Sequence, residues 1–220
     1  MNTLFCFVRR TPSAVLLFLQ LIMLITTPLL SDTPNAHAVS WVMGAVALFL
    51  VALIIRQSPV FNAVGFVLVG TALVLSGLVA WAGMGQLVVW ANLAEAAAYF
   101  YAATGLVVYM LEDHVVTRDE LFAAAVVFTL LAWGFAFLYS ACQTLYPHSF
   151  TAAVNIDAPR TWLELLFLSF TSMSSTGLGD IVPITPPARV ISAIQMFTGV
   201  MYVALIVSRL VGMAGVKTSK

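Results

Sequence analysis

The sequence predicts an all-α integral membrane protein with six transmembrane helices and one short re-entrant helix, on three observations. Of its 220 residues, 62% are hydrophobic and only 8% are charged. Six apolar segments are long enough to cross the roughly 30 Å hydrocarbon core of a bilayer as helices. A shorter apolar run lies between the fifth and sixth segments and ends in a glycine-containing stretch. Composition therefore predicts the membrane class, and the order of the segments predicts the architecture.

The six expected spans are separated by short polar connections. They cover residues 14–30, 39–55, 60–82, 87–111, 121–141 and 190–211. A charged link at 112–120 divides a four-helix amino-terminal region, residues 1–117, from a second domain, residues 118–220. Such a charge run favours a solvated turn, although it could also couple the two regions. Residues 142–160, which include Pro147, Asn155, Asp157 and Pro159, are typical of a surface loop.

The first span has a second interpretation. Arg9 and Arg10 precede its apolar run, and the residues 36–38 (Ala-His-Ala) resemble a signal-peptidase site, so residues 1–38 could be a cleaved leader. The run is 17 residues long and ends well before that site. These two features favour a retained helix.

The basic residues predict the orientation. With the amino terminus inside, seven of the nine Lys and Arg fall on the cytoplasmic side, and only Arg160 and Arg189 face out. Cytoplasmic connections are enriched in Lys and Arg. We therefore expect a multi-pass plasma-membrane protein with both termini in the cytoplasm.

The fourth span contains a carboxylate but no basic residue. A voltage sensor needs several arginines on one transmembrane helix, so steep voltage gating by that mechanism is not expected. Glu95 shares a helical face with Asn92 and Tyr99. An acid at this depth is a candidate proton-sensing switch, and the alternative is a polar clamp between helices.

Several function classes find no support in the sequence. It contains no HExxH or Gly-x-Ser-x-Gly motif and no convergent His, Asp and Cys set, so we expect no enzyme and no cofactor. Net charge is zero and no basic block is present, which argues against nucleic acid as a partner. A transporter would carry paired broken helices in two related halves, whereas this chain has one such element.

The short apolar run at 162–174 has a clear start. Thr161 and Glu164 fit a capping box after Pro159, because each side chain can satisfy a free backbone N–H group of the other. Thirteen residues are too few to cross the bilayer. Irregular backbone at membrane depth is tolerated only where protein surrounds it or where it lines a watery cavity. The run therefore predicts a re-entrant loop that enters from outside.

The residues after this run suit a row of carbonyl groups that replaces the water shell of an ion. Successive carbonyls face one way only if alternate residues take left-handed backbone angles, which Gly177 and Gly179 allow at no steric cost. Thr176 and Leu178 would then point away from the axis. Asp180 would lie at the outer mouth and concentrate cations.

Residues 171–183 resemble the signature of the potassium-channel pore family, TxxTTVGYGD followed by proline, and the resemblance covers about 121–212. It implies a homotetrameric potassium channel in the bilayer, in a bacterial inner membrane by likeness to small bacterial members. It also implies a hinge at Gly199, for which close helix packing is the alternative. The resemblance places permeant K⁺ ions at the carbonyls of Ser175, Thr176, Gly177, Leu178 and Gly179.

Three residues depart from that signature. Ser175 replaces threonine, Thr176 replaces valine, and Leu178 replaces an aromatic residue that hydrogen bonds brace in the family. Packing against Leu168 or Phe167 is the expected substitute. A loosely braced filter leaves a weakly selective monovalent cation channel open, and a non-conducting accessory subunit is a further alternative.

The last span carries an apolar stripe at helical spacing. If it faces the axis, the stripe lines a cavity whose inner end gates by dewetting; otherwise it faces lipid or a neighbouring helix. On the outer side, Arg189 could pair with Asp180 of its own or a neighbouring chain. The residues of the stripe are Met196, Val200, Val203, Val207 and Val211.

Overall fold

The computed structural model describes residues 12–30, 62–112 and 118–216. The elements in chain order are α2 (Pro12–Leu30), α4 (Asn62–Ala82), η1 (Gly85–Leu87), α5 (Val88–Glu112), α6 (Arg118–Leu145), β1 (Phe150–Ala152), α7 (Trp162–Met173), β2 (Ile181–Pro183) and α8 (Pro186–Val216). The fold is thus helical apart from two three-residue strands. The expected span at 39–55 lies outside the described residues.

Four described helices are long and apolar enough to cross a membrane, which confirms the third to sixth expected spans. They cover Ala63–Ala82, Gly85–Leu111, Asp119–Leu145 and Pro186–Arg209. The first expected span is also helical, as α2, and the apolar part found in it is the shorter stretch Ser13–Thr26. The chain is therefore a multi-pass membrane protein.

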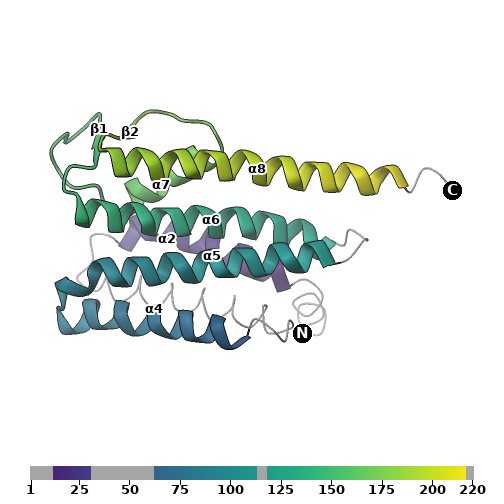
Figure 1. Cartoon of the computed structure of the whole chain (residues 1–220), viewed down its shortest axis with the longest axis horizontal. Helices are drawn as coiled ribbons and strands as arrows, with labels where there is room; N and C mark the ends of the chain where they lie inside the picture. The colour runs from purple at the N-terminus through teal and green to yellow at the C-terminus, as the bar shows by residue number, and fades with distance from the viewer. Residues whose placement is uncertain (1–11, 31–61, 113–117, 217–220) are drawn as a thin grey trace.

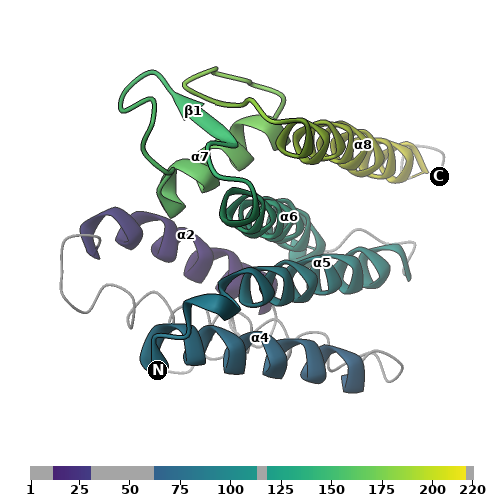
Figure 2. The same ribbon diagram turned by 60° about the vertical axis from the view of Figure 1, so that its left-hand side comes forward.

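Helix α6 is the centre of the arrangement. Figure 1 shows α4, α5, α6 and α8 running side by side along the long axis of the molecule. In Figure 2, α2 and α5 lie against one side of α6, while α7 and α8 lie against the other. The amino-terminal helices and the segment around α7 are therefore held in place by the same helix.

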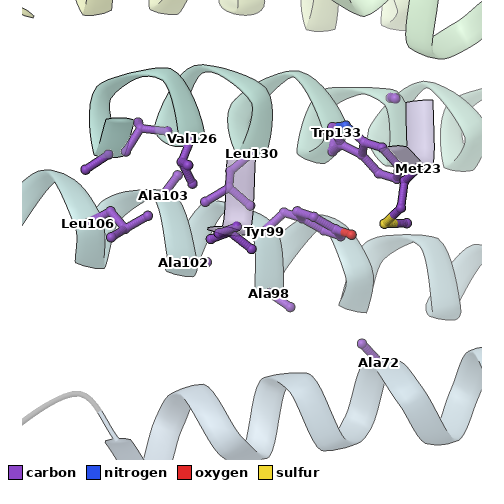
Figure 3. Close-up of a cluster of buried hydrophobic side chains, with 14 of the residues drawn as sticks. Met23, Ala72, Ala98, Tyr99, Ala102, Ala103, Leu106, Val126, Leu130 and Trp133 are labelled. Carbon is purple, nitrogen blue, oxygen red and sulfur yellow. The ribbon is translucent and has the colours of Figure 1, made fainter. Parts of the chain in front are cut away.

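Two apolar clusters stabilise this arrangement. The larger joins α2, α5 and α6, where the ring of Tyr99 stacks on Trp133 with centroids 6.0 Å apart and Leu130 lies beside them (Figure 3). The smaller surrounds Tyr139 and Phe150 and joins the end of α6 to α7 and to the strands. The second cluster lies beside the glycine-containing segment that the sequence singles out.

The loop expected at 142–160 is shorter than predicted. Helix α6 continues to Leu145, and β1 then pairs antiparallel with β2, with Thr151 opposite Val182. Phe150 is buried in the smaller cluster, which gives the strand an apolar anchor. Alternation of buried and partly buried residues over only three positions is too short a pattern to detect in the sequence.

Asp119 and Glu120 of the charged link are both buried, whereas the sequence predicts a solvated turn there. The Asp119 carboxylate accepts hydrogen bonds from the Ser13 backbone N–H (3.1 Å) and hydroxyl (3.0 Å). It thereby satisfies one of the free N–H groups at the start of α2. Glu120 pairs with Arg209 of α8 at 3.4 Å. Asp119 and Glu120 are buried because the start of α2 and the end of α8 both contact the first turn of α6.

Glu95 acts as a polar contact between helices. Its carboxylate accepts a hydrogen bond of 2.8 Å from the Ser76 hydroxyl on α4. One turn earlier, the Asn92 side-chain amide donates to the Ser140 hydroxyl on α6 at 2.9 Å. Of the two interpretations of Glu95, these contacts favour the clamp.

Candidate functional site

Helix α7 begins with the capping box that the sequence predicts. The Thr161 N–H donates to Glu164 Oε2 at 2.6 Å, and the Glu164 N–H donates to Thr161 Oγ1 at 3.3 Å. The two bonds satisfy N–H groups that the first turn of a helix leaves free. The start of α7 is therefore fixed by its own sequence.

Arg160 holds the loop that leads into α7, a role that the sequence analysis missed. Its buried guanidinium donates to the Val154 carbonyl (3.3 Å) and to the carbonyls of Asn155 and Ala158, and it pairs with Glu164 at 3.2 Å. The backbone of Arg160 also exchanges two hydrogen bonds with the Gln143 side chain on α6, at 2.7 and 2.9 Å. Because Gln143 and Arg160 are 17 residues apart, no local spacing reveals this contact.

The backbone after α7 alternates as predicted. Gly177 has φ of 55° and Gly179 has φ of 74°. Ser175 also takes a positive φ, of 58°, which the sequence analysis did not foresee. A non-glycine residue in this region costs about 1 to 2 kcal/mol. Left-handed angles at every second residue are the backbone pattern that a row of carbonyls facing one way requires.

Hydrogen bonds join the end of α7 to the segment that follows it. The Thr171 carbonyl accepts from the N–H groups of Thr176 (2.9 Å) and Gly177 (3.2 Å). The hydroxyls of Ser174 and Thr176 lie 2.8 Å apart. The position of the segment therefore follows the position of α7.

The packing of Leu178 against Leu168 or Phe167 stays a prediction. The Leu178 side chain is 63% exposed, and Leu168 is buried in the smaller cluster. Residues 174–180 are all exposed. The left-handed residues on either side of Leu178 direct its side chain outward, away from the rest of its own chain.

The outer end of the segment is held by the strands. The Asp180 carbonyl accepts from the Ala153 N–H at 3.2 Å, and β2 begins at the next residue. The Asp180 side chain is exposed. Arg189 donates to the Pro183 carbonyl at 3.3 Å, and the ion pairs found among the described residues do not join it to Asp180. The pairing within one chain is thus not observed.

Helix α8 turns one face to its own chain and exposes the predicted stripe. Met196, Val200, Val203 and Val207 are all exposed, while Val211 lies on the helix with its side chain outside the described residues. Gly199 is buried on the neighbouring face of α8. A Cβ added there would collide with the Met173 carbonyl, so Gly199 allows close packing of α8 on the end of α7.

A long helix, a short capped helix, a segment of alternating left-handed residues and a second long helix together define a membrane channel domain. Residues 121–214 match the family model described as "Ion channel", and this segment of the chain is therefore similar to the pore region of that family. The match confirms the pore-family resemblance drawn from the sequence. No curated protein and no solved structure matches the chain.

Proposed function

We propose that the protein is a homotetrameric potassium channel whose filter is the backbone of residues 175–179. The observation that carries this proposal is the left-handed backbone at alternate positions 175, 177 and 179. Such alternation presents the carbonyls of Ser175, Thr176, Gly177 and Leu178 as K⁺ ligands, in place of the hydration shell. K⁺ is then the permeant ion, and no cofactor is needed.

The length of α7 supports a re-entrant path. Its 12 residues extend about 18 Å at 1.5 Å per residue, well short of the roughly 30 Å hydrocarbon core. In a six-span topology with both termini in the cytoplasm, α7 enters from outside. The partial negative charge of its carboxyl end then faces the membrane centre and stabilises a waiting cation. Asp180 concentrates cations at the outer mouth.

A ring of carbonyls requires several copies of this chain, because each copy supplies one filter segment. The exposed faces of α7, α8 and the filter give an apolar surface through which four copies can surround an axis, and the family is typically oligomeric. Residues 118–220 then form the pore. In this arrangement the stripe from Met196 to Val211 lines the cavity, with the gate near its last two residues.

One observation favours a second candidate, a weakly selective monovalent cation channel. Leu178 has no hydrogen-bonding side-chain atom and is 63% exposed in its own chain. A filter braced less firmly than one with an aromatic residue discriminates less between ions of different size. The accessory-subunit alternative is less favoured, because both filter glycines keep the backbone geometry that conduction needs.

The test is ion flux from liposomes that contain the purified full chain, with K⁺ and Na⁺ gradients compared. We expect K⁺ flux far above Na⁺ flux. Equal fluxes would replace the selective channel by the weakly selective one. No flux with either ion, across a range of pH and voltage, would contradict conduction and favour the accessory subunit.

A further inference from the structure

Behind the filter, a buried hydrogen-bond network joins α6, α7 and α8. The Gln195 side-chain amide of α8 donates to the Ser169 carbonyl (2.9 Å) and the Ser169 hydroxyl (2.6 Å) of α7. Its oxygen accepts from the Tyr139 hydroxyl of α6 at 2.5 Å. Gln195, Tyr139 and Ser169 have no exposed surface at all.

The donors and acceptors of this network match. The Ser169 hydroxyl donates to the Ala132 carbonyl of α6 at 2.6 Å while it accepts from Gln195. The Tyr139 oxygen lies 3.0 Å from the Ser192 hydroxyl, which can donate to it while Tyr139 donates to Gln195. No side-chain atom of the network is among the unsatisfied buried atoms of the described residues. A fully satisfied buried network is rigid and specifies one arrangement of its helices.

The network and a close backbone contact join α8 to α7 on successive turns of α8. Gln195 contacts Ser169, and four residues later Gly199 lies against Met173, the last residue of α7. Residues four apart lie on one face of a helix, so both pairs belong to the same helix–helix contact. The filter begins two residues after Met173, so the depth of α7 sets the depth of the filter.

We propose that Gln195 is a positioning residue for ion selection, which rests on the proposed channel function. It fixes the depth and rotation of α7 relative to α6 and α8, and thereby the spacing of the filter carbonyls. Apolar contacts alone would permit α7 to slide, whereas directed hydrogen bonds to both the carbonyl and the hydroxyl of Ser169 define one position. The network supplies from behind the restraint that Leu178, with no polar atom, cannot supply from its own side chain.

The test compares the K⁺ to Na⁺ permeability ratio, from bi-ionic reversal potentials of the full chain in planar bilayers, across matched variants. Gln195→Met keeps the length of the side chain and removes all its hydrogen bonds. Tyr139→Phe removes only the hydroxyl that contacts Gln195. Tyr146→Phe makes the same chemical change on an exposed tyrosine just beyond α6, where the polar contacts found are made by the backbone.

We expect Gln195→Met to lower the permeability ratio by about tenfold, the change in an equilibrium constant that one lost buried hydrogen bond produces. Tyr139→Phe should lower it less, and Tyr146→Phe should leave it unchanged. Both network variants should still conduct K⁺. A second readout is the rise in melting temperature of the purified protein when K⁺ replaces Na⁺, which should shrink in the same order.

The outcomes separate this inference from the proposed function. A selective wild type whose ratio is unchanged in Gln195→Met and Tyr139→Phe would overturn the positioning role. A ratio that falls equally in Tyr146→Phe would also overturn it. If Gln195→Met does not fold, the Tyr139→Phe ratio decides. A wild type without flux, or without preference for K⁺, would instead contradict the proposed potassium channel itself.

Discussion

Helices α6 and α8 are alike in sequence character and opposite in environment. Both are long, apolar candidate spans, of 27 and 24 residues, yet 56% of the most apolar stretch of α6 is buried within the chain and only 17% of that of α8. Helix α6 is surrounded by α2, α5, α7 and α8. Apolarity alone therefore does not tell whether a membrane helix is covered by its own chain, by lipid or by other copies.

The buried residues of α8 tolerate fewer side chains than its exposed residues do. Where α8 contacts α7, Gly199 leaves no space for a side chain and Gln195 has every polar group satisfied. Its exposed surface carries mostly apolar side chains, such as Val200 and Val203. The first face specifies the position of α7, and the second is free to meet lipid, an aqueous cavity or another subunit.

The largest expected effect comes from Gly199→Ala, which tests the covered face of α8. The new Cβ would collide with the Met173 backbone, and overpacking against backbone costs about 3 kcal/mol. We expect a marked fall in the melting temperature and loss of ion flux. Gly70→Ala on α4 is the matched control, because a Cβ there meets nothing within 4 Å.

A Gly199→Ala protein with the stability and flux of the wild type would contradict the close contact between α7 and α8. If the bulkier variant Gly199→Val also folded, a hinge would explain Gly199 better than close packing does. Both variants are measured by circular dichroism melts and by flux.

The next largest effect compares a substitution on α6 with one on α8. Leu130→Ala on α6 empties a fully buried position and should cost about 2 to 5 kcal/mol of subunit stability. Val200→Ala on α8 removes a side chain that is exposed in the single chain. We expect it to leave the subunit melt unchanged, because in the proposed channel this side chain lines the aqueous cavity. If Leu130→Ala and Val200→Ala lowered subunit stability equally, the difference in burial between the two positions would not determine stability.

The smallest effect concerns the cap that fastens α2 to α6. Asp119→Ala removes both hydrogen bonds to Ser13, and loss of a helix cap costs about 1 kcal/mol. The exposed Asp157 in the outer loop gives the control Asp157→Ala. We expect the melting temperature to fall in Asp119→Ala and to stay unchanged in Asp157→Ala. Identical melting temperatures would indicate that the hydrogen bonds between Asp119 and Ser13 do not stabilise the contact of α2 with α6.

Local signals were predicted well from the sequence. The capping box of Thr161 and Glu164 and the left-handed angles of Gly177 and Gly179 depend on residues at most three apart, so spacing alone reveals them. The apolar spans follow from composition in the same way. These features set the elements of the channel domain and the backbone of its candidate filter.

Contacts between distant residues were not predicted. Asp119 and Glu120 were assigned to solvent because a charge run is usually wet, whereas the start of α2 and the end of α8 bury them. Gln195 carried a usable signal, since a polar side chain within a membrane helix seeks a partner. Its partners on α6 and α7 are 56 and 26 residues away, and only the fold identifies them.

The most direct test of the account is the flux of Gly177→Ala beside Gly70→Ala in the same liposomes. Gly177 has φ of 55° and open space around a Cβ in its own chain, so the substitution acts on the backbone angle and costs about 1 to 2 kcal/mol there. The account predicts an assembled Gly177→Ala protein without ion flux, and wild-type flux for Gly70→Ala. Normal flux through Gly177→Ala would contradict a carbonyl filter at this segment.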